Sequence, residues 1–136
     1  MTVPTPISTA FSFTKLVVGD LDEMAAFYRR VYELEEVRRV RDEIGEEAID
    51  EIVLGSGGEM APGSLILLRF VDRPPSRNGE VLLGFTTDDL PGLLERVVAA
   101  GGRIHAEMKE IPEMKLRVAF ATDPEGHLAE LVQMLA

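Results

Sequence analysis

The chain contains no cysteine, and this absence removes several kinds of site at once. Disulfides, thiolate nucleophiles and cysteine-ligated zinc or iron–sulfur centres are all excluded. Positive charge is also scarce, with 14 lysines and arginines against 24 acidic residues and a net charge of −10. The basic residues form no dense cluster. Nucleic acid and membrane surfaces both attract proteins through local positive potential, so neither is an expected partner.

Long hydrophobic runs are missing as well. No stretch approaches the length that a membrane-spanning helix needs. The first ten residues have neither the positive start nor the apolar segment of a signal peptide. We therefore expect a cytoplasmic protein. A chain of 136 residues suffices for one domain with one modest core.

The first half of the chain has one helical pattern among several strand patterns. A strand over 11–18 alternates its faces, with Phe13, Lys15 and Val17 on one side. Asp20 and Glu23 have the spacing of a capping box, which predicts a helix whose apolar stripe covers a sheet. The strands that follow are expected over 36–43, 48–54 and 65–70, with a loop over 55–64.

The second half repeats this order. A strand over 81–87 leads to Asp88 and Asp89, which begin a helix, and Gly101-Gly102 ends it. Three further strands are expected over 103–108, 115–122 and 126–134, with a loop over 109–114.

The two halves form an internal repeat, in which Gly19-Asp20-Leu21 matches Asp88-Asp89-Leu90 at a distance of 69 residues. Each half is too small to bury a core alone, so the two must share one. The sequence therefore predicts an α+β fold of duplicated βαβββ modules, with two mixed sheets around a concave cleft and the helices on the outer faces. The predicted segments are an arm over 1–10, a first module over 11–73, a linker over 74–80 and a second module over 81–136.

A third motif comes near the end, where the turn Asp123-Pro124-Glu125-Gly126 precedes Glu130-Leu131. Together with the two helix starts, it resembles the vicinal oxygen chelate superfamily, which includes glyoxalases, extradiol dioxygenases and bleomycin-resistance proteins. The resemblance covers nearly everything from residue 11 onward. It implies a small-molecule site in the cleft, and a homodimer, since members of this family commonly dimerise.

The resemblance also implies where a metal would be held. In metal-dependent members four ligands converge in the cleft, one from the first and one from the last strand of each module. The matching positions here are Phe13, Leu67, Leu82 and Glu130, of which three are apolar. One carboxylate does not hold a catalytic divalent ion, because zinc sites need about three protein ligands. We therefore expect no metal cofactor.

Strand alternation predicts a mostly apolar cleft, the usual character of a small-molecule site. Its candidate ligand-binding residues are Phe13, Lys15, Leu67, Arg69, Leu82, Thr86, Phe120 and Glu130.

Glu130 has two possible roles. It is either ion-paired with Lys15 or Arg69, or desolvated by its apolar neighbours so that its raised pKa makes it a general acid or base.

Three functions follow in order of preference. The first is metal-free binding of a small, largely apolar or aromatic molecule. The second is a metal-independent lyase or isomerase that uses Glu130 as acid or base. The last is a metal-dependent glyoxalase, a lactoylglutathione lyase, with a relocated site.

Overall fold

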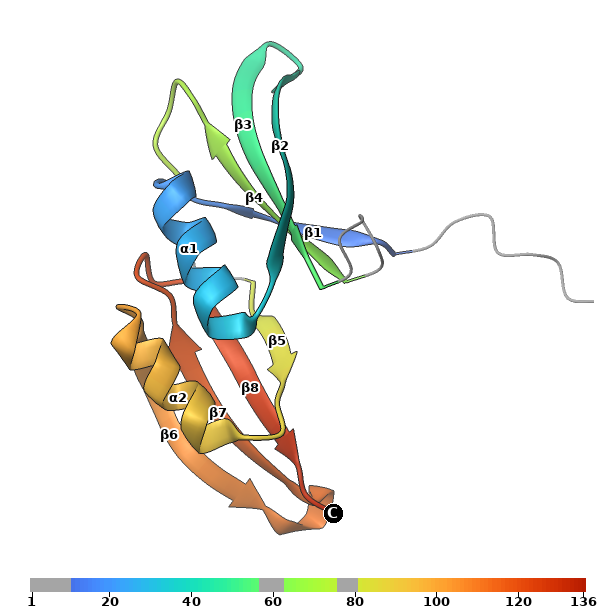
Figure 1. The fold of residues 1–136 in the computed structure, drawn as a ribbon, viewed down its shortest axis with the longest axis vertical. Helices are drawn as coiled ribbons and strands as arrows, with labels where there is room; N and C mark the ends of the chain where they lie inside the picture. The colour runs from blue at the N-terminus through green and yellow to red at the C-terminus, as the bar shows by residue number, and fades with distance from the viewer. Residues whose placement is uncertain (1–10, 57–62, 76–80) are drawn as a thin grey trace, which may run out of the picture.

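The computed structural model describes residues 11–56, 63–75 and 81–136. The predicted arm over 1–10 and parts of the predicted 55–64 loop and 74–80 linker lie outside the described residues. The rest of the chain forms two modules with the same order of elements, strand–helix–strand–strand–strand (Figure 1).

Each module contributes one four-stranded mixed sheet. The first sheet has the order β1-β4-β3-β2 and the second has the order β5-β8-β7-β6. In each, the first and last strands of the module are parallel neighbours, and the remaining neighbours are antiparallel. The predicted α+β duplication is therefore confirmed. The elements are β1 (Phe13–Val17), α1 (Leu21–Tyr32), β2 (Glu35–Ile44), β3 (Glu47–Gly55), β4 (Ser64–Phe70), β5 (Leu83–Thr86), α2 (Leu90–Ala99), β6 (Arg103–Ile111), a 3-10 turn (Pro112–Met114), β7 (Leu116–Thr122) and β8 (Leu128–Met134).

Both helices begin at the aspartate that the repeat singled out. The Asp20 side chain accepts a hydrogen bond from the Glu23 amide at 2.9 Å, and Asp89 accepts one from the Gly92 amide at 3.1 Å. Each bond satisfies a first-turn donor that has no partner within its helix. The same local chemistry therefore starts the helix in each module.

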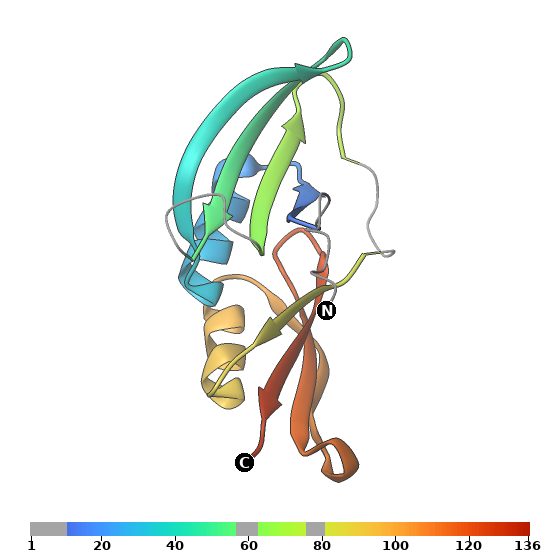
Figure 2. The same ribbon diagram turned by 90° about the vertical axis from the view of Figure 1, so that its right-hand side faces the viewer.

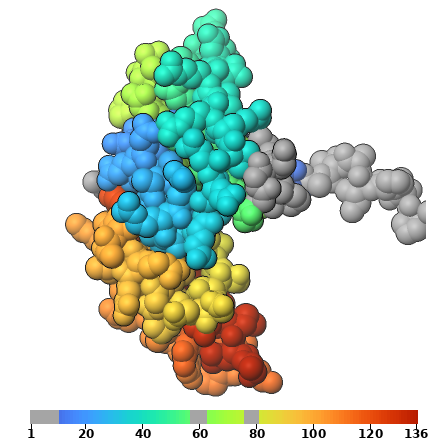
Figure 3. Space-filling view, viewed as in Figure 1, coloured from blue at the N-terminus to red at the C-terminus, as the bar shows by residue number. Residues whose placement is uncertain are grey.

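The two helices lie next to each other on one side of the sheets (Figures 1 and 3). Their apolar stripes enter a single core to which both modules contribute, and Tyr32 of α1 stacks on Phe85 of β5 with ring centroids 3.8 Å apart. The opposite face of each sheet carries no helix (Figure 2). The modules are thus joined on their helix side. The fully buried core side chains include Met24, Tyr28, Val31, Leu54, Leu67, Leu90, Val97 and Leu131.

The predicted loop over 109–114 is shorter in the structure, because β6 continues to Ile111. Lys109 and Glu110 pair with Val118 and Arg117 of β7, and Arg117 forms an ion pair with Glu110 at 3.2 Å. Residues 107–110 of β6 are exposed and mostly polar, so hydrophobic alternation does not indicate this extension of the strand. Among the described residues, no helix is long and apolar enough to cross a membrane.

Candidate functional site

The pairing of β1 with β4 decides which residues face away from the helices. Leu16 lies opposite Leu67, and both are buried in the core beneath α1. Lys15 lies opposite Ile66, so these two share the helix-free face, because successive side chains alternate. The prediction that Leu67 lines the cleft is wrong, and Ile66 occupies that face in its place.

Arg69 is likewise on the helix side, where it forms a long ion pair with Asp50 at 3.8 Å. The prediction that it lines the cleft is wrong for the same reason. Residues 65–68 of β4 are all apolar and buried on both faces. A strand of this kind has no hydrophobic alternation from which its orientation can be read.

The helix-free face of the first sheet carries an ion pair between Lys15 and Glu51, with Nζ and Oε2 2.6 Å apart. No aligned hydrogen bond to the Glu51 Oε2 atom is found among the described residues. Since β4 separates β1 from β3, the pair crosses over Ile66 and Leu68, each only 2% exposed. Sequence reasoning missed Glu51, although an acid inside the apolar strand predicted over 48–54 was a signal.

The helix-free face of the second sheet carries Glu130, which lies between Gly84 of β5 and Phe120 of β7. Thr86 is on the same face by alternation. Gly84 has open space where a side chain would begin, so room exists beside the carboxylate.

Glu130 is exposed and has no ion-pair partner in the described parts of the chain. Lys15 pairs with Glu51 and Arg69 with Asp50, so the predicted pairing of Glu130 with Lys15 or Arg69 is wrong. Apolar neighbours do not enclose its carboxylate in a single chain either. The sequence could not exclude Lys15 or Arg69 as a partner of Glu130, because it does not show that these two side chains pair with Glu51 and Asp50.

The modules meet at a small cavity of about 260 Å³. It brings together Phe13 of the first module and Leu82 of the second, 42% and 48% exposed. Gly84 also lines it, whereas Lys15, Thr86, Phe120 and Glu130 are outside its lining. Phe13 and Leu82 therefore meet at an apolar junction, while Lys15 lies on the first sheet and Thr86, Phe120 and Glu130 lie on the second.

The residues at the implied metal positions do not fit a catalytic metal. Phe13, Leu67 and Leu82 offer no donor atom, nor does Ile66, which lies on the helix-free face in place of Leu67; this leaves the carboxylate of Glu130 alone. Within 11–56, 63–75 and 81–136, no three histidines or acids come together in a way that could hold an ion. No chemical step is therefore assigned to a metal.

A buried polar network joins the modules behind this face. His127 Nδ1 lies 2.7 Å from Asp123 Oδ2, and His127 Nε2 lies 3.0 Å from the carbonyl oxygen of Val17. Both ring nitrogens face acceptors, an arrangement that favours the doubly protonated, cationic imidazole. The Tyr28 hydroxyl donates a third contact to the network, to Asp123 at 2.8 Å.

The network shifts the pKa of each of its members. Burial disfavours the imidazolium, but the hydrogen bond and charge of Asp123 outweigh it and raise the pKa of His127. Burial likewise opposes the Asp123 anion, yet its bonds with His127 and Tyr28 lower the pKa of Asp123. Burial and the nearby Asp123 charge raise the pKa of Tyr28, which stays protonated.

Glu125 makes a second connection between the modules. Its two carboxylate oxygens accept hydrogen bonds from the amides of Gly19 and Asp20, each at 2.8 Å. The predicted turn over 123–126 is present, closed by a Gly126 amide bond to the Asp123 carbonyl at 3.0 Å. Its acids therefore have a structural role that the sequence alone did not reveal. His105, by contrast, is exposed on β6.

Comparison with known proteins agrees with this architecture. Residues 10–131 match the model of the Glyoxalase/Bleomycin resistance protein/Dioxygenase superfamily. The chain is 30% identical to a probable lactoylglutathione lyase of Vibrio cholerae, over 88% of this chain and 87% of that protein. It is 31% identical to lactoylglutathione lyase GLX1 of Arabidopsis thaliana, over 85% of this chain but only 41% of the plant protein.

A solved structure extends the comparison to three dimensions. A glyoxalase family protein from Bacillus cereus superposes with a TM-score of 0.82 at 18% identity, covering 99% of this chain and 100% of that one. At this identity the likeness concerns the fold alone. The family match, which spans most of the chain, goes further: this protein belongs to the glyoxalase/bleomycin resistance protein/dioxygenase superfamily.

Proposed function

We propose that the protein binds a small, largely apolar or aromatic organic molecule on the helix-free faces of its two sheets, without a metal ion. The observation that carries this proposal is the side-chain set at the four implied ligand positions. Three of them, Phe13, Leu67 and Leu82, are apolar, as is Ile66, which lies on the helix-free face in place of Leu67, and Glu130 alone has a donor atom. An apolar surface with few polar groups suits recognition by burial of ligand surface.

Two polar groups would orient such a ligand. Lys15, held by Glu51 on the first sheet, offers a cation to a carboxylate or phenolate. Glu130 offers a carboxylate that no residue of the described chain engages, beside the open space at Gly84. Because these two groups are on different sheets, a ligand between them would contact both modules.

A second copy of the chain would complete the site. Phe11, Phe13, Val81 and Leu82 are exposed apolar residues near the module junction, and patches of this kind commonly mark interfaces. A homodimer would cover them and enclose the ligand. We also expect the protein to reside in the cytoplasm.

An alternative within the same site is a metal-independent lyase or isomerase. The unpaired state of Glu130 favours it, because a general base must be free to reach the substrate. The names of the 30%-identical relatives favour a lactoylglutathione lyase instead. The donor set at the implied metal positions argues against a metal-dependent form of this activity.

Three measurements distinguish these functions. Elemental analysis of protein purified without chelator is expected to find substoichiometric metal; a stoichiometric divalent ion would contradict the proposal. An assay of lactoylglutathione lyase activity, with and without added Zn²⁺, Ni²⁺ or Mn²⁺, is expected to show no turnover. A screen of aromatic carboxylates by calorimetry is expected to find a ligand.

Substitution of Glu130 separates binding from catalysis. If the protein only binds, Glu130→Gln changes the affinity of the identified ligand by a few-fold. If Glu130 transfers a proton, turnover of the corresponding substrate falls by about two to four orders of magnitude. Glu107→Gln, which removes a charge from an exposed position of β6, is the matched control.

A further inference from the structure

A row of charged residues crosses the helix side of the first sheet, next to the start of α1. Arg41 of β2, Asp50 of β3 and Arg69 of β4 are partners on neighbouring strands, so their side chains project from one face. The Asp50 carboxylate lies 3.5 Å from Arg41 Nε and 3.8 Å from Arg69 Nη1. Charge-assisted hydrogen bonds are shorter, about 2.7–2.9 Å. One carboxylate is therefore shared loosely by two guanidinium groups.

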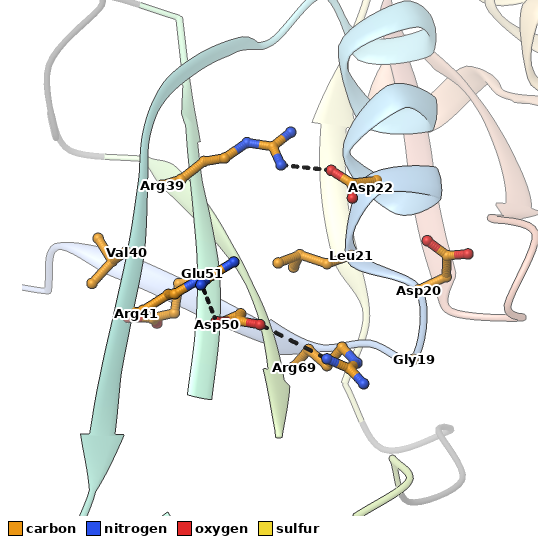
Figure 4. Close-up of a pocket in the computed structure, with 10 residues that line it drawn as sticks. All are labelled: Gly19, Asp20, Leu21, Asp22, Arg39, Val40, Arg41, Asp50, Glu51 and Arg69. Atoms are coloured by element: carbon orange, nitrogen blue, oxygen red, sulfur yellow. Dashed lines mark ion pairs between the residues drawn. The ribbon is translucent and has the colours of Figure 1, made fainter. Parts of the chain in front are cut away.

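This row borders a cavity of about 440 Å³ (Figure 4). The opposite wall is formed by residues 19–22, at the beginning of α1. Figure 4 shows the Leu21 side chain pointing toward the strands, between the row and the separate Arg39–Asp22 ion pair. The cavity thus has an apolar middle and two guanidinium groups along one edge.

The other acids that line the cavity already have partners. Asp22 pairs with Arg39 at 2.7 Å. Glu51 pairs with Lys15 on the far side of the sheet. Asp20 accepts the amide hydrogen bond that starts α1. Asp22 and Glu51 are thus paired with other cations, and Asp20 faces a backbone amide, so no ion pair joins any of these acids to Arg41 or Arg69 among the described residues.

Arg41 and Arg69 differ from the other arginine of the cavity in how little they are engaged. Arg39 makes two hydrogen bonds to Glu36, each 3.1 Å long. Within the described residues, Arg41 and Arg69 make no aligned hydrogen bond and share one acid, Asp50. Their side chains are 91% and 41% exposed, so a ligand can reach both.

We propose that Arg41 and Arg69 form a second binding site, which takes a carboxylate or phosphoryl oxyanion of a small molecule seated against Leu21. A guanidinium group presents paired N–H donors that match the oxygens of either anion. Two such groups share the single carboxylate of Asp50, so the row itself carries one more positive charge than negative charge. The site is on the helix side of the sheet, so it does not depend on the function proposed for the helix-free face.

The test is a titration of the ¹⁵N-labelled protein with inorganic phosphate, with acetate, and with sodium chloride at matched ionic strength. Saturable shifts are expected at the Leu21 and Asp22 amides and at the Nε–H groups of Arg41 and Arg69, with phosphate, acetate or both. The anion that produces them identifies the source as phosphoryl or carboxylate. Shifts no larger than those with sodium chloride would overturn the proposal.

Variants then assign the effect to the two arginines. Arg41→Gln and Arg69→Gln are each expected to weaken binding about three- to tenfold, and Asp50→Asn to strengthen it, since a competing anion is removed. Arg29→Gln removes an equal charge from an exposed position of α1 outside the cavity and should have no effect. The proposal fails if Arg29→Gln weakens binding as much as Arg41→Gln. An unchanged amide spectrum of each variant verifies its fold.

Discussion

His127 and Asp123 form a buried ion pair, with Nδ1 and Oδ2 2.7 Å apart, that fixes the turn before β8 to the first module. The side chains are only 2% and 1% exposed, so solvent screens the pair very little. Stability is linked to proton binding, so the shifted pKa values of this pair predict how the protein responds to pH.

The first prediction concerns alkaline pH. The folded-state pKa of His127 is raised above its ordinary value of 6.5. Its contribution to stability is therefore fully present below about pH 6.5 and is lost as pH rises through the raised value. Urea unfolding from pH 5 to 9 should show a free energy of unfolding that falls above about pH 6.5. Each unit of pKa elevation contributes about 1.4 kcal/mol.

His127→Gln serves as the comparison, because it cannot carry the charge. Its unfolding free energy should lack the alkaline decline, although it starts lower at pH 6. If the free energy of unfolding depends on pH equally in both proteins, the proposed role of His127 is wrong. At the acidic end the sign is opposite. Asp123, whose pKa is lowered below 3.8, stabilises the fold above that pH and ceases to do so as pH falls through the lowered value.

The second prediction separates the contacts of Asp123. Tyr28→Phe removes one of its donors and leaves the His127 bond, so it should lower the free energy of unfolding by about 1–2 kcal/mol. Asp123→Ala leaves the imidazolium buried without a partner and should cost about 3–5 kcal/mol. Tyr32→Phe is the control, since no hydrogen bond of its hydroxyl is found among the described residues. A larger loss for Tyr28→Phe than for Asp123→Ala would contradict the assignment.

The third prediction compares two glycines by adding one methyl group to each. A Cβ on Gly102 would lie 2.5 Å from the Thr122 carbonyl oxygen and 2.8 Å from Val97 Cγ1. Gly102→Ala should therefore destabilise the fold by about 1–3 kcal/mol through overpacking. Gly84→Ala meets no atom within 4 Å and should change stability by less than about 0.5 kcal/mol.

Thermal unfolding of both variants is the measurement. The same Gly84→Ala change narrows the space beside Glu130, so it should reduce ligand affinity while the fold is unaffected. A Gly84→Ala variant as unstable as Gly102→Ala would show that the open space is absent in solution.

The fourth prediction concerns the ion pair on the helix-free face. Lys15→Met leaves the Glu51 carboxylate, 10% exposed, without its cation and should cost about 1–3 kcal/mol. The double change Lys15→Met with Glu51→Gln should recover most of this loss, because the remaining group is neutral. Denaturant unfolding of both single variants and the double variant completes the cycle. Additive losses would mean that the two side chains do not interact in solution.

The parts of the fold that depend on local chemistry could be read from the sequence. The capping aspartates Asp20 and Asp89 start their helices as predicted, because a cap needs only an amide three residues away. The repeat of these caps then indicated the duplicated fold. Phe13 and Glu130 fall on the helix-free faces for a similar reason, since alternation along a predicted strand places them, and Leu82 joins Phe13 at the cavity between the modules.

The errors arise where distant residues or uniform strands decide the outcome. Leu67 and Arg69 were assigned to the wrong face because β4 is apolar on both sides. The partners of Glu125 are more than a hundred residues away along the chain, and no local sequence pattern predicts them. The predicted acid–base role of Glu130 is still a prediction.

The contacts that join the modules are separate from the exposed helix-free face, and this separation affects how the sequence can change in evolution. The buried bonds of Asp123, Glu125 and His127 hold the modules together behind the face where Phe13, Leu82 and Glu130 are exposed. Substitutions on that face leave the joint intact. Changes at a few open positions of the proposed site can therefore accumulate in a lineage of such chains without unfolding the protein.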